Sequence, residues 1–188
     1  MGCMNEKSKI RFHDPQIRAL IPLDFKEQKR KFHIPRRLLR KVMKNPFEIT
    51  FNKNFHSIIK ECASIPRNNK GGWINKEIIE LYSDLYKEGH AHSIEVWDNQ
   101  KLIGGLYGVA LGAAFFGESM FSKINDASKI ALVHLVANLK NSGFQLLDAQ
   151  FPNPHLNQFG AYKVTKKVFK KKLKNAIKTH LDFNPEQN

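Results

Sequence analysis

The sequence predicts an α+β protein in which helices flank a largely antiparallel sheet. Apolar residues recur at helical spacing in several separate segments, and a long run rich in β-forming residues lies between positions 92 and 117. The length supports the same class, because 188 residues can bury one good core with a small extension. We therefore expect one domain with an appended segment.

The elements of the first third follow from local patterns. Residues 1–34 carry dense charge with little periodicity, which predicts an irregular arm with a short strand at 19–21. A short helix is expected from Pro35, because proline fits a first helical turn and apolar residues follow at helical spacing. Residues 47–51 alternate like a strand, and residues 55–62 carry the apolar stripe of a helix.

Helices and strands alternate along the rest of the chain. Asn75 can cap a helix that Gly89 ends, and Asp126 or Ser128 can cap a later helix that runs to residue 139. The other elements expected are strands at 92–97, 102–111, 113–117 and 144–150, and a basic helix from 165 onward.

Three glycines interrupt the expected strand at 102–111. Gly104, Gly105 and Gly108 have no side chain to pack on a sheet. Glycine within a strand typically marks a β-bulge or a close approach of another backbone. We expect one of these two features in this strand.

Positive charge is concentrated at the two ends of the chain. The formal net charge is +14, and residues 1–44 hold 13 Lys and Arg against 4 Asp and Glu. Residues 163–178 hold 8 lysines and no acidic residue, whereas the long middle is nearly neutral. Such an asymmetry favours a polyanionic partner, most simply a nucleic acid, although a basic surface can also serve solubility alone.

Several other classes are disfavoured. No stretch approaches the roughly 18 apolar residues of a membrane helix, and no signal peptide opens the chain, so we expect a soluble, cytoplasmic protein. Cys3 and Cys62 provide neither a metal framework nor a structural disulfide. His90 and His92 have no third ligand nearby, so no metal site is expected.

Glu118 is an unusual carboxylate for this chain. It lies in the segment Gly-Glu-Ser-Met-Phe-Ser at 117–122, directly after an apolar run in which a strand is expected to end. Apolar surroundings make an unpartnered carboxylate costly and raise its pKa. Glu118 therefore has either an internal partner or a cationic partner that arrives with a ligand.

A second polar pair closes the last expected strand. Asp148 and Gln150 are two residues apart, so a strand places them on the same face. A carboxylate beside an amide can position an amine and guide its proton. An Asp at a strand end is also a common loop cap, and the pattern alone leaves both interpretations open.

Several longer motifs stand in one order and together resemble a known family. They are Gly-Gly-Trp-Ile (71–74), Gly-His-Ala-His-Ser-Ile-Glu-Val-Trp (89–97), Gly-Gly-Leu-Tyr-Gly-Val-Ala (104–110), Gly-Glu-Ser-Met-Phe-Ser (117–122), Asn-Asp-Ala-Ser-Lys (125–129) and Leu-Leu-Asp-Ala-Gln (146–150). This series closely resembles the leucyl/phenylalanyl-tRNA–protein transferases, bacterial aminoacyltransferases of the N-degron pathway. The resemblance covers residues 14–170 and is strongest over 71–150.

The resemblance implies a fold and an activity. The fold is a GNAT-like acyltransferase core with a mixed, largely antiparallel sheet flanked by helices and a short basic N-terminal extension. The activity is transfer of Leu or Phe from charged tRNA to the N-terminal Arg or Lys of acceptor proteins, which marks them for degradation. The ester is already activated, so no cofactor is required, and we expect a monomer.

The resemblance also implies roles for individual residues. Glu118 matches the glutamate that receives the acceptor's basic side chain, while Gln150 and the supporting Asp148 match the pair that handles its α-amine. Two further groups match the family: an aminoacyl pocket formed by Leu106, Phe115 and Met120, and a tRNA-binding helix that carries Arg36, Arg40 and Lys44.

The family pattern differs from this chain at the N-terminus. The family has an upstream Gly-Ile-Phe-Pro segment and two tryptophans, whereas Phe12 and His13 stand in their approximate place here. We therefore expect a truncated basic segment at 1–45, a GNAT-like catalytic domain at 46–180 and a tail at 181–188. Two alternatives stay open: a tRNA-binding module with impaired catalysis, and a CoA-dependent acyltransferase of the same fold.

Overall fold

The structure is a computed structural model that describes residues 2–4, 10–23, 30–44, 46–65 and 72–183. The tail expected at 181–188 lies mostly outside this range. The strands are β1 (Gly2–Met4), β2 (Ile10–Phe12), β3 (Ile17–Ile21), β4 (Glu48–Phe51), β5 (Ala91–Asp98), β6 (Lys101–Leu111), β7 (Ala114–Ser122), β8 (Leu146–Gln150) and β9 (Tyr162–Thr165). The helices are α1 (Arg36–Met43), α2 (Phe55–Ser64), α3 (Lys76–Lys87), α4 (Ala127–Asn141), α5 (Pro154–Asn157) and α6 (Lys166–Ala176).

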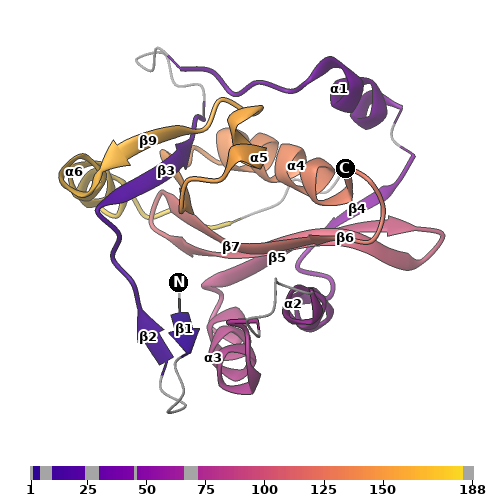
Figure 1. Cartoon of the computed structure of the whole chain (residues 1–188), viewed down its shortest axis with the longest axis horizontal. Coiled ribbons are helices and arrows are strands. Elements are labelled where there is room, and N and C mark those ends of the chain that lie inside the picture. Colours follow the sequence, from indigo (N-terminus) through magenta and orange to yellow (C-terminus); the bar gives the residue numbers. More distant parts are fainter. Residues whose placement is uncertain (1, 5–9, 24–29, 45, 66–71, 184–188) are drawn as a thin grey trace.

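A mixed sheet of seven strands forms the centre of the molecule, in the order β4-β5-β6-β7-β8-β3-β9 (Figure 1). Every neighbouring pair is antiparallel except β7 and β8, which are parallel. The predicted α+β class and the largely antiparallel sheet are therefore confirmed. The additional pair β1-β2 forms a separate two-stranded ribbon.

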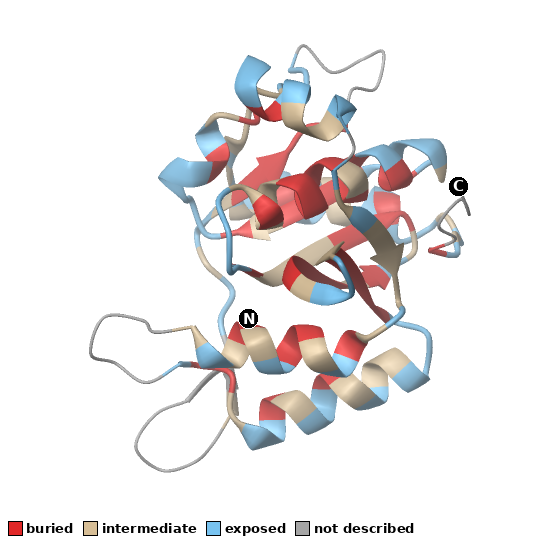
Figure 2. Ribbon diagram, turned by 90° about the vertical axis from the view of Figure 1, so that its right-hand side faces the viewer, coloured by how far each residue is buried: buried red, intermediate tan, exposed pale blue. Residues whose placement is uncertain are grey.

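Helices cover both faces of this sheet. Helix α4 packs on β5, β6 and β7 from one side, whereas α2 and α3 pack on the other side. Figure 2 shows the central helix buried along most of its length, and nine of the residues of α4 are buried. The amphipathic α2 and α3 begin where expected, since the side chains of Asn54 and Asn75 accept hydrogen bonds from the first helical turns.

The glycines of β6 let helices approach the sheet closely from both sides. A Cβ atom at Gly104 would lie 2.4 Å from the Cβ of Ala127 in α4. A Cβ at Gly105 would lie 2.4 Å from the side chain of Ile58 in α2. In the pairing of β5 with β6, Val96 is opposite Gly104 and Trp97 is opposite Leu102, so Ile103 is an extra residue of β6 and both the close approach and the predicted bulge are present.

The structure differs from the predicted elements in several places, among them the ribbon β1-β2, which lies in the arm that was expected to be irregular. Strand β7 continues to Ser122 instead of ending at Gly117, because β6 is long enough to pair with the added residues. Strand β9 and the short helix α5 were not expected. Both are too short for a clear periodicity, and β9 is defined by its pairing with β3.

Strand β3 comes from the N-terminal segment and lies between β8 and β9 in the main sheet. Its residues Leu20 and Ile21 are buried in the core. Residues 17–21 thus contribute to the same sheet as residues 46–180. The proposed division of the chain at residue 45 stays a prediction.

The start of α4 is fixed by the preceding strand. Asp126 occupies the position before the helix, but its side chain makes no capping hydrogen bond and instead binds Lys129 at 2.8 Å. The Oγ atom of Ser122 accepts the hydrogen bond from the backbone N–H of Ser128, also at 2.8 Å. The end of β7 and the start of α4 are therefore tied together.

Within the described residues, no helix combines the length and apolar character that crossing a bilayer requires.

Candidate functional site

Glu118 is the extra residue of a β-bulge. In the pairing of β6 with β7, Tyr107 is opposite Ser119 and Gly108 is opposite Gly117, which leaves Glu118 without a partner. A bulge re-aims the side chain of the unpaired residue and is common beside functional sites. Met120, on the far side of the bulge, stands opposite Leu106.

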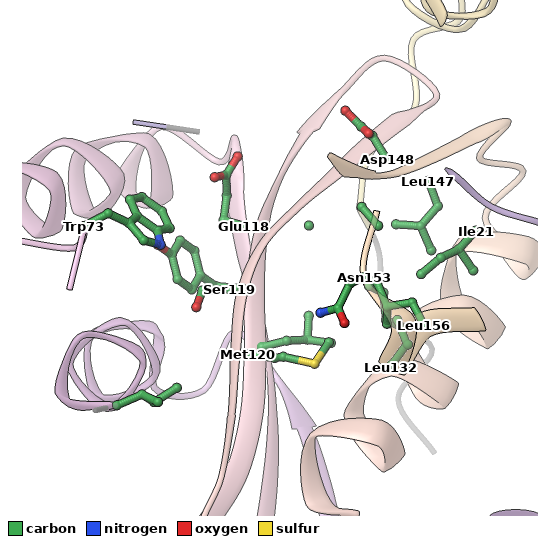
Figure 3. A pocket seen from close by; sticks show the side chains of 16 residues that line it. Ile21, Trp73, Glu118, Ser119, Met120, Leu132, Leu147, Asp148, Asn153 and Leu156 are labelled. Atoms are coloured by element: carbon green, nitrogen blue, oxygen red, sulfur yellow. The ribbon is translucent and has the colours of Figure 1, made fainter. Parts of the chain in front are cut away.

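Strands β7 and β8 diverge directly beyond this point. Their parallel pairing covers only Ala114–Phe116 and Leu146–Asp148, although β7 continues for six further residues, to Ser122. Backbone and side chains on the two diverging segments therefore face a gap in the sheet. Figure 3 shows the side chains of β7, including Glu118 and Met120, on one side of this gap and those of Leu147 and Asp148 on the other.

The gap contains a cavity of about 420 Å³, which we call the main cavity. This size lies in the ordinary range for small-ligand sites. Its lining is mostly apolar: Ile21, Ile65, Trp73, Leu106, Tyr107, Met120, Leu132, Leu135, Leu147, Ala149 and Leu156, with Gly117, Glu118, Ser119, Asp148 and Asn153.

Only two of the three residues predicted to form the aminoacyl pocket line the same cavity. Leu106 and Met120 line the main cavity, whereas Phe115 is not among the lining residues. Phe115 is fully buried in the core, where its ring lies 5.6 Å from that of Phe183.

A second cavity of about 360 Å³, the rim cavity, shares part of this wall. It is lined by Gly117, Glu118, Ala149, Gln150, Phe151, Pro152, Asn153, Pro154 and Leu156. Glu118 thus contributes to both cavities, and Gln150 lines the rim cavity.

The carboxyl group of Glu118 is only partly satisfied. Its Oε2 atom is buried and has no hydrogen-bond partner among the described residues. Burial raises the pKa of Glu118, while hydrogen bonds to Gln150 and Tyr82 act in the opposite direction. None of the described residues forms an ion pair with Glu118.

Asp148 and Gln150 are linked through the backbone. The Oδ1 atom of Asp148 accepts a hydrogen bond from the backbone N–H of Gln150 at 2.8 Å. Gln150 adopts a left-handed backbone conformation with φ 64°, which ends β8 in a tight turn. The Nε2 atom of Gln150 donates to the carbonyl oxygen of Gly117 at 3.0 Å and so bridges the gap between β7 and β8.

Three further residues of the site were not predicted from the sequence. Arg18 pairs with Asp148, since its guanidinium nitrogen lies 2.5 Å from Oδ2. Trp73 lines the main cavity, and Tyr82 is close enough to Glu118 to lower the pKa of that carboxyl group. The motif around Trp73 and the polar hydroxyl of Tyr82 were available signals, whereas Arg18 gave no local signal.

The predicted tRNA-binding helix is separate from the cavities. Arg36, Arg40 and Lys44 are all exposed on α1 or at its C-terminal cap. Their spacing of four residues places them along one side of the helix. Leu38 anchors the helix in the core, and Lys41 donates to the carbonyl oxygen of Asn125 at the start of α4.

Among the described residues, no group of three or more His, Cys, Asp or Glu side chains is arranged to hold a metal ion. His92 is buried, and its Nδ1 atom lies 3.1 Å from the amide of Asn52.

Comparison with known proteins decides the family. Residues 27–174 match the sequence pattern of the family described as leucyl/phenylalanyl-tRNA protein transferase, which is most of the chain. The chain belongs to this family. The structure places the family's motifs at 104–110, 117–122 and 146–150 on three neighbouring strands, where they meet at the gap in the sheet.

Curated relatives within the transferase family cover nearly the whole chain. A leucyl/phenylalanyl-tRNA–protein transferase of Hyphomonas neptunium is 50% identical over 171 residues, which are 91% of this chain and 64% of that protein. Those of Phenylobacterium zucineum and Maricaulis maris are 46% and 44% identical over 97% and 94% of this chain. The chain spans 64% of the length of the Hyphomonas protein, 80% of the Phenylobacterium protein and 79% of the Maricaulis protein.

Proposed function

We propose that this chain transfers leucine or phenylalanine from charged tRNA to the N-terminal Arg or Lys of acceptor proteins. The observation that carries the proposal is Glu118, whose Oε2 atom is buried on the wall shared by the main cavity and the rim cavity and has no hydrogen-bond partner among the described residues. A cationic side chain would satisfy this oxygen. Family membership supplies the reaction, and its relatives carry the transferase name.

The main cavity has the chemistry expected for the transferred side chain. Leu106 and Met120 face it from neighbouring strands, and leucines from α4 and β8 complete an apolar wall. Leu and Phe side chains gain free energy by leaving water for such a wall. Met120 has a flexible side chain that can adapt to both shapes. The participation of Phe115 in this pocket stays a prediction.

The acceptor's amine is proposed to meet the ester beside Gln150. The Nε2 group of Gln150 is engaged by the carbonyl of Gly117 and by Glu118, which leaves Oε1 to accept a hydrogen bond from the amine. The amine nitrogen attacks the ester carbonyl, the carbon–oxygen bond to the tRNA ribose breaks, and the ribose oxygen leaves with a proton from the amine. Because an amide is a very weak base, Gln150 is proposed to orient the amine rather than hold its proton.

The tRNA is proposed to bind along α1. Arg36, Arg40 and Lys44 form an exposed row of positive charge, and phosphate groups are the natural partners of such a row. Binding of this kind positions the tRNA without reading its sequence. The cytoplasm as location and a monomer as the active form are parts of the same proposal.

The GNAT-like character of the core is likewise proposed. It is supported by a mixed sheet with helices on both faces and by one parallel strand pair that diverges at the site. Superposition of an experimental structure on GNAT acyltransferases would test it.

Transfer of labelled leucine from Leu-tRNA to a peptide that begins with Arg tests the whole proposal. We expect product with this peptide and none with the same peptide acetylated at its N-terminus or beginning with Ala. Binding of Leu-tRNA without any transfer would show a tRNA-binding module instead. Transfer of acetyl groups from acetyl-CoA would show the CoA-dependent alternative.

A further inference from the structure

The carboxylate of Asp148 is occupied on both oxygens. Its Oδ1 atom accepts the backbone N–H of Gln150, and its Oδ2 atom pairs with Arg18 at 2.5 Å. The side chain of Asp148 has no exposed surface. Each oxygen of Asp148 therefore has a partner within the protein.

Arg18 is itself held from three directions. Its guanidinium group lies over the ring of Phe169 in α6, 4.3 Å from the ring centre. A second guanidinium nitrogen lies 3.5 Å from Asp14, which in turn pairs with Lys166 at 2.7 Å. Stacking on an aromatic ring together with paired carboxylates fixes the planar guanidinium more firmly than a flexible ammonium could be fixed.

Two successive contacts connect Arg18 to the proposed reaction centre. Arg18 orients Asp148, and Asp148 holds the N–H of Gln150 in its left-handed turn. The turn determines where the amide of Gln150 lies across the gap from Gly117. Buried ion pairs contribute little net stability, so this pair is better explained by the conformation that it enforces.

We propose that Arg18 is a positioning residue for aminoacyl transfer, and that it acts on Gln150 through Asp148. The inference rests on the proposed function. Asp14, Phe169 and Lys166 extend the arrangement to the N-terminus of α6, away from both cavities. Loss of Arg18 should therefore change the rate of the chemical step more than the binding of either substrate.

Arg18→Gln removes the charge, and Arg18→Lys retains the charge without the planar stacked group. With saturating Leu-tRNA and an Arg-peptide, we expect kcat to fall by up to about 100-fold in Arg18→Gln, since small displacements of a positioning group have effects of this size. The acceptor KM should change little, and Arg18→Lys should recover part of kcat. Arg30→Gln is the matched control, because Arg30 also stacks on a ring, that of Tyr162, but is not paired with Asp148.

The ionisation of Asp148 gives a readout that does not depend on activity. Burial raises the pKa of Asp148 and Arg18 opposes this rise, with Glu118 the other charged group facing it among the described residues. Removing Arg18 should raise the pKa of Asp148 further, because the opposing positive charge is lost. Carbon-13 NMR titration of the Asp148 carboxyl group in wild type, Arg18→Gln and Arg30→Gln measures this directly. In the pH profile of kcat, the acidic limb should move to higher pH in Arg18→Gln and stay unchanged in Arg30→Gln.

The possible results separate the two proposals. A wild-type protein without transferase activity overturns the proposed function, whereas the NMR titration still tests the coupling of Arg18 to Asp148. An unchanged kcat and acidic limb in a folded Arg18→Gln variant overturn the role of Arg18. Should Arg18→Gln not fold, Phe169→Leu decides, because it keeps all charges and removes only the stacking. We expect it to lower kcat without changing tRNA binding, and an unchanged kcat in Phe169→Leu overturns the inference.

Discussion

At the scale of single residues, Glu118 combines an unfavourable environment with a proposed role in recognition. Its position in the bulge directs a carboxylate to the boundary between two cavities, and burial raises its pKa. Such a placement lowers the stability of the free protein, and the proposed acceptor carries a cationic side chain that compensates for it.

Replacing Glu118 by Gln should weaken recognition of the acceptor. Truncating one partner of a desolvated charge pair costs about 2 to 5 kcal/mol, so the acceptor KM should rise strongly and the preference for Arg and Lys should decline. Steady-state kinetics with peptides that begin with Arg, Lys and Ala measure this. Glu77→Gln, on the exposed side of α3, is the control that should behave as wild type. Retention of full discrimination in Glu118→Gln would show that the cation binds elsewhere.

The same substitution should stabilise the free protein at neutral pH. The pKa of Glu118 is raised above its ordinary value of 4.5, so the folded state binds its proton more tightly than the unfolded state does. The stabilisation that comes from the protonated carboxyl group of Glu118 is therefore lost as the pH rises through its folded-state pKa. Glu118→Gln avoids this loss. We expect Tm to rise by a few degrees at pH 7. The gain should disappear in acid, where the wild-type carboxyl group is also neutral, and a Tm below wild type at pH 7 would contradict this account.

Met120 should control which aminoacyl group is accepted. Met120→Ala enlarges the main cavity between β7 and α4 and removes the adaptable wall. Apolar pockets discriminate shapes by roughly 10- to 200-fold, so the preference for Leu and Phe over Val and Ile should relax within that range. Competition between charged tRNAs in one transfer assay measures the ratio. An equal loss for every aminoacyl group would assign Met120 to the core alone.

At the scale of elements, α1 is the structural unit to test for tRNA binding. Replacing Arg36, Arg40 and Lys44 together by Ala should weaken tRNA binding and make its salt dependence shallower by about one unit per lost phosphate contact. Filter binding of Leu-tRNA at several salt concentrations gives this slope. A triple replacement of Lys60, Lys76 and Lys87, which are exposed on α2 and α3, is the control. Equal salt dependence of tRNA binding in the two triple variants would indicate that α1 is an ordinary solvated surface without phosphate contacts.

The elements that the sequence predicted are those whose determinants are local. Helices α2 and α3 combine an apolar stripe with an asparagine cap. The glycines of β6 are required because a Cβ atom at these positions would clash with neighbouring atoms. The bulge at Glu118 depends on the register between two strands, which no single segment encodes. The pairing of Arg18 with Asp148 joins residues that are 130 positions apart, so no spacing rule applies to it. The motifs pointed to Glu118, Asp148 and Gln150, which line the main cavity or the rim cavity, without showing how they are held.

At the scale of the whole molecule, the positive charge is arranged around a nearly neutral core. Helix α1 carries one basic surface, and α6 carries another at the opposite end of the molecule (Figure 1). Part of the charge on α6 is already engaged, because Lys166 and Lys170 lie near Asp14. Neither basic helix contributes a residue to the lining of the two cavities.

The position of β3 between β8 and β9 also sets an order of events during synthesis. β3 is synthesised well before both of its partner strands, β8 and β9. Until they are made, its edges have no native partner in the main sheet, and contacts between such distant segments form late. The part of the proposed site that holds Asp148 and Gln150 can therefore assemble only after β8 has been synthesised. A nascent chain released before β8 would contain the segments of α1 to α4 and would lack both of these residues.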